Sequence, residues 1–147
     1  RLVGSEMCIR DRNRDVHLHM PEGAIGKEGP SAGVAFAASL ISLLTGKALP
    51  TTLAMTGEVS LRGMVLPVGG LKEKLLAAHR AGIKTVILPA HNRSSVEADV
   101  PKSVLDDLDV HYVTNIWAAL DVAFGPGTWS EQASVWSANE TPEAASQ

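Results

Sequence analysis

Residues 54–89 read AMTGEVSLRGMVLPVGGLKEKLLAAHRAGIKTVILP, and this stretch decides the class of fold. Apolar runs at residues 59–61 and 64–68, joined by an Arg-Gly pair, predict a hairpin. In residues 71–82 leucines recur at helical spacing and a glycine closes the run, so a helix is expected. Residues 84–88 are rich in strand-forming side chains, which predicts a buried strand that the following proline stops.

The flanking sequence continues the alternation of helices and strands. A helix is expected over residues 31–46 and a short strand over 52–55. Further along, the patterns predict loops and short helices over 92–108, a strand over 109–113 and a helix over 115–124. The predicted class is therefore α/β (α+β), with mixed sheets and packed helices.

The two ends of the chain differ in character from its middle. Residues 16–20 alternate apolar and polar side chains like a half-buried strand, and residues 21–30 are a Gly- and Pro-rich loop. We expect residues 1–13 to be an unmatched leader and residues 14–124 to form one domain. Residues 125–147 contain glutamates but no Lys or Arg, and are predicted to be a disordered acidic tail.

Composition excludes several classes of function. The chain has 147 residues, with 13 Lys and Arg against 16 Asp and Glu, so it has no basic footprint for nucleic acid or anionic membrane. No apolar run approaches the ~18 residues of a membrane helix. One cysteine, Cys8, excludes an internal disulfide, and His17 and His19 lack a third ligand at a metal-binding spacing. No metal site is expected.

The sharpest local motif is GPSAG at residues 29–33. A serine at the start of a helix lies near oriented N–H groups, which stabilise the negative charge that acyl transfer to serine produces. The alternative is that Ser31 is only the N-cap of the helix. The motif also satisfies G-x-S-x-G, but a loop precedes it in place of a strand, which disfavours a Ser–His–Asp hydrolase.

A nucleophilic serine needs a base, and the sequence offers histidines and lysines. The candidates are His79, His91, His111, Lys47, Lys72, Lys74, Lys84 and Lys102. A lysine serves as a base only when neutral, so burial must lower its pKa from ~10.4 towards ~7–8. On the predicted helix, Lys72 and Lys74 flank the apolar face on opposite sides, and helical spacing leaves both open.

The segments PEGAIGKEGPSAG (residues 21–33) and 54–89 closely resemble the C-terminal proteolytic domain of Lon, the ATP-dependent serine protease. The resemblance covers about residues 14–124. It implies a Lon-type proteolytic fold and a serine endopeptidase that hydrolyses unfolded or misfolded proteins through a Ser-Lys dyad. By resemblance Ser31 is the nucleophile, Lys74 the base, and Thr56 helps to hold the lysine.

The resemblance also assigns the loop before the serine. It implies that Gly29 and Pro30 shape the approach to the nucleophile and that amides around Glu28–Ser31 supply the oxyanion donors. Glu28 stands where the family usually has Asp, which keeps the charge and lengthens the reach.

Further expectations concern the parent protein. The resemblance implies that this chain is an N-terminally truncated piece whose parent assembles as a homo-oligomer, with a hexamer as the expected form. ATP and Mg would belong to an AAA+ module of that parent, because no phosphate-binding loop occurs here: Gly46-Lys47 is followed by Ala48. The implied location is the bacterial cytoplasm, with the mitochondrial matrix also compatible.

A rival interpretation is a non-catalytic Lon-like oligomerisation module of an ATPase. Such modules typically lack the serine and the lysine, and both residues are present here.

Overall fold

A parallel three-stranded sheet forms the centre of the structure, a computed structural model that describes residues 30–126. The strands lie in the order β1 (Leu53–Met55), β4 (Thr85–Pro89) and β5 (Asp109–Val113). Thr85 of the central strand is in register with Leu53 on one side and Asp109 on the other. Together with an antiparallel ribbon described below, this confirms the predicted α/β (α+β) class with mixed sheets.

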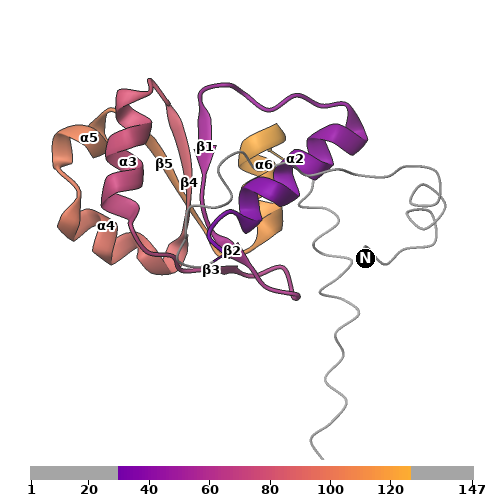
Figure 1. Ribbon diagram of the computed structural model, residues 1–147, viewed down its shortest axis with the longest axis horizontal. Helices are drawn as coiled ribbons and strands as arrows, with labels where there is room; N and C mark the ends of the chain where they lie inside the picture. The colour runs from indigo at the N-terminus through magenta and orange to yellow at the C-terminus, as the bar shows by residue number, and fades with distance from the viewer. Residues whose placement is uncertain (1–29, 127–147) are drawn as a thin grey trace, which may run out of the picture.

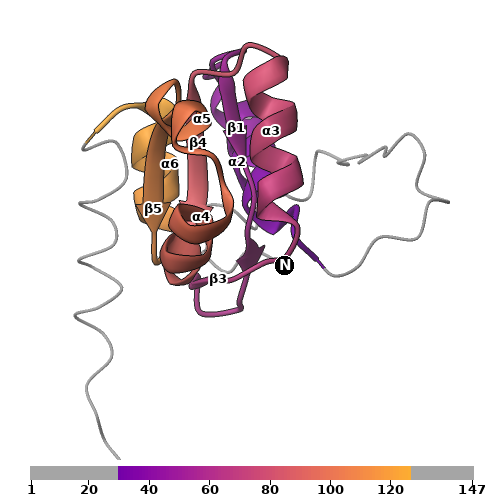
Figure 2. The same cartoon turned by 90° about the vertical axis from the view of Figure 1, so that its left-hand side faces the viewer.

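Helices cover both faces of this sheet, as Figures 1 and 2 show. One face carries α2 (Gly33–Thr45) and α6 (Ile116–Phe124). The other carries α3 (Leu71–Arg80), α4 (Arg93–Asp99) and α5 (Lys102–Asp106), and the short 3-10 turn η1 (Ala90–Asn92) joins β4 to α4. The crossovers between the parallel strands thus cover one face of the sheet, and the helices before β1 and after β5 cover the other.

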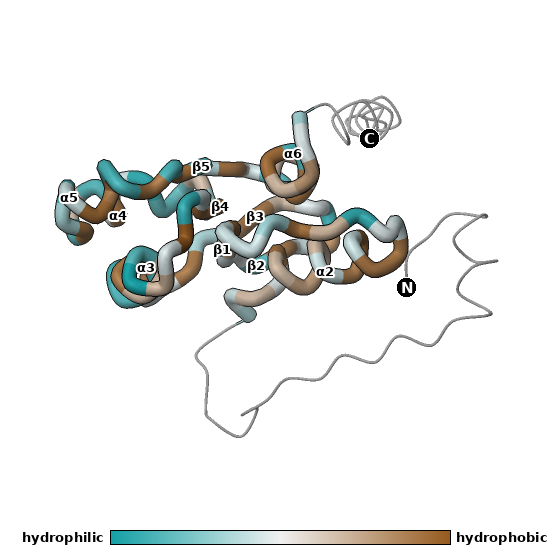
Figure 3. The backbone as a smooth tube through the Cα atoms, turned by 90° about the horizontal axis from the view of Figure 1, so that it is seen from above, coloured by the Kyte–Doolittle hydropathy of each residue, from teal (hydrophilic) through white to brown (hydrophobic). Residues whose placement is uncertain are grey.

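The central strand β4 explains why the sheet needs helices on both faces. Ile87 packs with α2 and α6, whereas Val86 and Leu88 pack with α3, α4 and α5. All three side chains are at most 3% exposed, so the strand is buried on both sides. Seen from above, α2 and α6 are hydrophobic over much of their length, and α3 carries hydrophilic stretches on its outer side (Figure 3).

A separate antiparallel ribbon consists of β2 (Glu58–Val59) and β3 (Val65–Leu66). The predicted hairpin is confirmed, but its strands are shorter than the apolar runs suggest. Ser60 N–H donates to Met64 O at 2.9 Å, and the Ser60 hydroxyl accepts from Met64 N–H at 3.1 Å. These bonds close a wider turn, which takes residues away from both strands.

Other predicted elements agree with the structure to within two residues at their ends. The helices expected over 31–46, 71–82 and 115–124 are confirmed as α2, α3 and α6. Pro89 is the last residue of β4, paired with Val113, so the strand extends one residue beyond its predicted end at residue 88. The strand predicted over residues 16–20 lies outside the described residues. No helix within residues 30–126 combines the length and apolar character needed to cross a membrane.

Two leucines test the placement of the core. Leu75 is 1% exposed and packs against the sheet, whereas Leu61 is fully exposed in the hairpin turn. We expect Leu75→Ala to lower the free energy of unfolding by about 2–5 kcal/mol, because it removes buried methyl groups and leaves a cavity. Leu61→Ala should change it by less than about 0.5 kcal/mol. Urea unfolding of both variants measures the difference, and equal losses would contradict this packing.

Candidate active site

Ser31 lies immediately before helix α2, against the segment that follows β1. Its carbonyl oxygen accepts hydrogen bonds from the backbone N–H of Gly57 at 2.8 Å and from the hydroxyl of Thr56 at 3.0 Å. Close by, Val34 N–H donates to Gly57 O at 3.1 Å. These three hydrogen bonds attach the start of α2 to the carboxyl end of β1.

Gly33 permits this close attachment because it has no side chain. A Cβ atom at this position would lie 2.9 Å from the backbone N of Val59 and 3.3 Å from the carbonyl O of Gly57. Both contacts are with backbone atoms, which cannot rotate away as a side chain can. A larger residue would therefore push the start of α2, and Ser31 with it, away from β2.

Ser31 is not the N-cap of α2, so the capping interpretation of this serine is wrong. The helix begins at Gly33, its N-cap position is Ala32, and no side chain makes a capping hydrogen bond there. The pairing of the Ser31 carbonyl with Thr56 and Gly57 holds this residue one position ahead of the cap. The serine hydroxyl therefore has no capping role in the part of the chain that the structure describes.

Lys74 approaches the same place from helix α3. Its backbone N–H donates to Gly70 O at 3.2 Å, so it lies in the first turn of the helix. The next residue, Leu75, is buried and holds this part of α3 against the sheet. From there Lys74 Nζ donates a hydrogen bond to Thr56 Oγ1 at 3.4 Å.

The hydroxyl of Thr56 joins the two candidate residues. It donates its proton to Ser31 O and accepts a hydrogen bond from Lys74 Nζ, which uses both capacities of a hydroxyl group. Thr56 itself is fixed, since its backbone N–H donates to Ile87 O of the central strand at 3.1 Å. The serine, threonine and lysine that the sequence singled out thus meet at one edge of the sheet.

These three residues line one cavity of about 230 Å³. The rest of the described lining is uncharged and mostly apolar: Ala32, Ala35, Ala54, Met55, Leu75, Ala78, Val86 and Leu88. Partial burial among these groups lowers the pKa of Lys74 below its ordinary value of 10.5, because water solvates the ammonium form less well there. The neutral amine, which a general base requires, is favoured accordingly.

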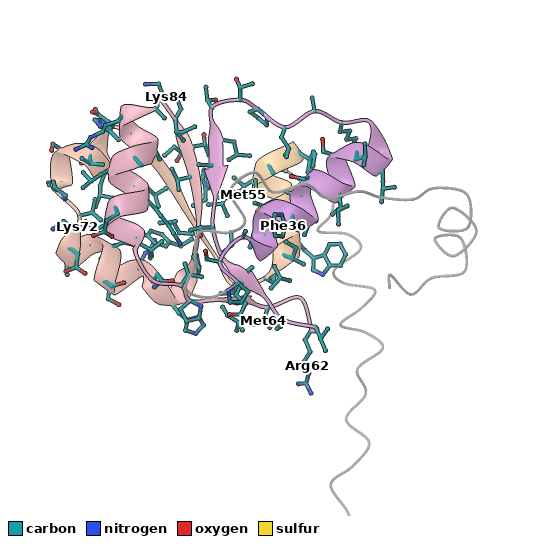
Figure 4. The ribbon with its side chains drawn as sticks, in the orientation of Figure 1. Phe36, Met55, Arg62, Met64, Lys72 and Lys84 are labelled. Carbon is teal, nitrogen blue, oxygen red and sulfur yellow. The ribbon has the colours of Figure 1, made fainter. Side chains whose placement is uncertain are left out.

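The structure separates the two lysines that helical spacing left open. Both lysines are solvent-exposed, but Lys72 lines a different cavity, of about 390 Å³, between the start of α3 and α4. Figure 4 shows Lys72 on the outer side of α3, away from α2. Two residues along a helix differ in direction by about 200°, so only one of this pair can face Ser31. Lys47, Lys84 and Lys102 do not line the cavity that contains Ser31 either.

The candidate histidines also lie elsewhere. His79 Nε2 is 2.8 Å from Asp107 Oδ2, and His111 Nε2 is 2.8 Å from Asp109 Oδ2. Neither pair lines the cavity beside Ser31, and His91 does not line it. The described residues therefore do not form a Ser–His–Asp triad around this serine.

The loop before the serine is described only in part. Pro30 is the first described residue, and its carbonyl accepts from Gly33 N–H at 3.3 Å. Glu28 and Gly29 lie outside the described residues, as do His17 and His19. Within residues 30–126, no group of His, Cys, Asp and Glu side chains is arranged to hold a metal ion.

Sequence reasoning missed two small residues that shape the cavity, Ala35 and Ala54. A signal for both was available. Ala35 lies four residues after Ser31, one helical turn on, and Ala54 lies two residues before Thr56, on the same side of the extended chain. Small side chains at these spacings leave room beside the serine and the threonine.

Comparison with known proteins places the chain in a family. Residues 5–125 match the family model described as the Lon protease (S16) C-terminal proteolytic domain, so the chain belongs to this family. The resemblance read from the motifs is thereby confirmed. The match begins at residue 5, within the stretch that the sequence patterns led us to expect as an unmatched leader.

Several curated relatives share this region. The Lon proteases of Erwinia amylovora and Escherichia coli (strain K12) are each 56% identical to the chain over 110 residues, or 75% of its length. The Lon protease of Frankia alni is 54% identical over 125 residues, or 84% of the chain. In each comparison the chain spans about 14% of the length of the relative.

The lowered pKa of Lys74 is directly measurable. We expect the Lys74 amine to lose its proton at lower pH in the folded chain than in the urea-unfolded chain, where no cavity surrounds it. Since the unfolded chain then binds more protons, stability should rise with pH between the two pKa values. NMR titration of the lysine side chains gives both values, and Lys74→Arg identifies the resonance. Identical folded and unfolded titrations would contradict the partial desolvation of this amine.

Proposed function

We propose that this chain is the serine endopeptidase domain of an ATP-dependent protease, with Ser31 and Lys74 as its catalytic dyad. One observation carries the proposal: the Thr56 hydroxyl bonds to the Ser31 carbonyl and to the Lys74 amine inside one apolar cavity. Membership of the Lon proteolytic domain family supports peptide-bond hydrolysis as the reaction.

The reaction begins with proton transfer from Ser31 to Lys74. The neutral amine takes the proton from Ser31 Oγ as this oxygen attacks the scissile carbonyl, and a tetrahedral intermediate forms. Collapse of the intermediate breaks the C–N bond, and the Lys74 ammonium returns its proton to the leaving amine. A water molecule, deprotonated in turn by Lys74, then hydrolyses the ester on Ser31 and restores both residues.

The negative oxygen of the intermediate needs hydrogen-bond donors. Two amides near the start of α2 are already used, because Gly33 N–H donates to Pro30 O and Val34 N–H donates to Gly57 O. We therefore assign the oxyanion to amides on the N-terminal side of Gly33, around residues 28–31. An oxyanion beside Ser31 would also lie near the favourable end of the α2 dipole.

Thr56 is the residue that holds the base. Its hydroxyl accepts from Lys74 Nζ, and its own backbone bond to Ile87 places that acceptor at a defined point of the sheet. A long lysine side chain loses rotamer freedom when it is ordered, and this hydrogen bond offsets part of that cost. Thr56 therefore acts by keeping the amine directed into the cavity.

The activity of the whole protein is part of the same proposal. By family resemblance, the substrates would be unfolded or misfolded polypeptides, and the parent would be a hexamer. ATP and Mg²⁺ would bind an AAA+ module, because the residues present form no phosphate-binding loop. The catalytic steps proposed for Ser31 and Lys74 do not involve nucleotide. The bacterial cytoplasm is the proposed location, with the mitochondrial matrix as the other.

Loss of either dyad residue tests the mechanism. We expect Ser31→Ala and Lys74→Ala to lower the rate of peptide-bond cleavage by at least about 10²–10⁴-fold, the contribution typical of a positioned general base. Lys72→Ala is the matched control, because Lys72 lies on the same helix but lines a different cavity. Cleavage of an unfolded protein, with and without ATP, is measured for this chain and for a chimera in which it replaces the matching segment of Escherichia coli Lon protease.

The outcomes separate the competing interpretations. Activity retained in Lys74→Ala would remove this lysine from the mechanism. Activity absent from a folded wild-type chimera would favour the non-catalytic oligomerisation module.

Thr56 allows a finer test of how the base is held. Thr56→Val keeps the shape of the side chain but removes the hydroxyl, so we expect kcat to fall by about 10- to 100-fold as the amine loses its direction. Thr56→Ser keeps the hydroxyl and should retain most of the activity. The initial rates of peptide cleavage compare the two, and equal activity in both variants would contradict the role given to the hydrogen bond.

A further inference from the structure

Asn92, the last residue of η1, makes an unusual pair of contacts. Its side-chain Oδ1 accepts from the backbone N–H of Val68 at 3.0 Å, and its Nδ2 donates to the carbonyl O of the same residue at 3.1 Å. Both bonds are partly buried, and the two residues are 24 positions apart along the chain. The side-chain amide therefore pairs with both backbone groups of Val68, as a neighbouring β-strand would.

Val68 lies in the segment that leads directly into α3, the helix that carries Lys74. Val68 is followed by Gly69 and Gly70, two exposed residues, and then by the first residue of α3. Gly70 takes the left-handed conformation, with φ of 67°. Glycine has the widest conformational freedom of any residue, so this pair does not by itself set the direction of the helix. The two bonds to Asn92 supply a fixed point just before the flexible pair.

Asn92 is itself attached to the element that positions Thr56. It lies three residues after Pro89, the end of β4, and Ile87 of this strand accepts from Thr56 N–H at 3.1 Å. Figure 1 shows the connection from β3 to α3 running along the edge of the sheet where α4 begins. The strand β4 thus positions Thr56, which accepts the hydrogen bond, directly. It positions Lys74, which donates that bond, through Asn92.

We propose that Asn92 is a positioning residue of the peptidase, which fixes the start of α3 and thereby keeps Lys74 Nζ beside Thr56 and Ser31. The inference rests on the proposed function for its effect on catalysis. Asn92 lines the cavity on the other side of α3 and does not line the one that contains Ser31. It acts through the backbone of Val68 and not on the substrate.

Removing the two hydrogen bonds between Asn92 and Val68 has a consequence beyond stability. When the start of α3 moves, the partly desolvated Lys74 amine becomes more fully hydrated, and the pKa of this amine rises towards its ordinary value. Lys74 is the one charged side chain among the described residues that line the cavity, so no neighbour there offsets this change. The neutral fraction at a given pH falls, and the rising part of the pH–rate profile moves to higher pH.

The experiment compares Asn92→Ala and Asn92→Asp with Asn115→Ala. Asp keeps the size and the acceptor for Val68 N–H but loses the donor to Val68 O. Asn115 is a matched control, because its side-chain Oδ1 also accepts a hydrogen bond from a backbone N–H, that of Ala118 at 2.9 Å. This bond lies at the start of α6, away from Lys74. The pH dependence of kcat and KM is measured for peptide cleavage, and Lys74 is titrated by NMR in the same proteins.

We expect both Asn92 variants to lower kcat near neutral pH by about 10- to 100-fold, with KM nearly unchanged and the pH–rate profile displaced to higher pH. Asn115→Ala should leave the position of the profile unchanged. Superimposable profiles for all variants would overturn the inference and leave the dyad intact. Failure of both Asn92 variants to fold, while Asn115→Ala folds, would also overturn it in favour of a purely structural role.

The NMR titration keeps this inference distinct from the proposed function. Should Lys74→Ala retain activity, the dyad would be wrong, yet the Lys74 resonance would still report its surroundings. A higher pKa of Lys74 in Asn92→Ala, which adds no charge, than in Asn115→Ala supports the positioning of the lysine in that case. An unchanged pKa overturns it.

Discussion

A single hydroxyl group connects the parts of the candidate site. Thr56 donates to the carbonyl of a residue 25 positions earlier and accepts from an amine 18 positions later along the chain, and both partners lie beside one cavity. Because its backbone N–H is bonded to the central strand, this hydroxyl has a defined place in the sheet. The start of α2 and the first turn of α3 are located with respect to it, so the geometry of the site follows from how these two helices reach Thr56.

The two candidate catalytic residues are anchored in different layers of the molecule. The helix that follows Ser31 packs into one hydrophobic cluster through Val34 and Ala38, whereas the helix of Lys74 packs into the other through Leu71 and Leu75. The central strand contributes to both clusters. A displacement of one helical layer relative to the sheet would therefore change the distance between serine and lysine without unfolding either layer.

The position of the site at one edge of the sheet also has a structural cause. In a parallel sheet the carboxyl ends of the strands lie together, and the segments that leave them meet at the same edge. Thr56 follows β1 there, and η1 with Asn92 follows β4. Loops and helix starts at this edge can vary while the sheet keeps them in register, which suits a place where several side chains must converge.

Much of the fold was readable from the sequence, because its signals are local. The apolar run of β4, the helical spacing of α3 and the glycines at turns depend on neighbouring residues, and each of these elements was confirmed.

Motif resemblance identified the Lon proteolytic family and named Ser31, Thr56 and Lys74 as a group. From the residues themselves, however, spacing favoured a helix cap at Ser31, and Lys72 and Lys74 were equivalent on the helix. The tertiary structure decided these points, because the contacts involved join segments far apart in the chain. They are the cavity beside Ser31, the hydrogen bond from Lys74 to Thr56, and the two hydrogen bonds between Asn92 and Val68. Contacts of that kind depend on how the helices pack on the sheet, and no periodicity within one segment records them.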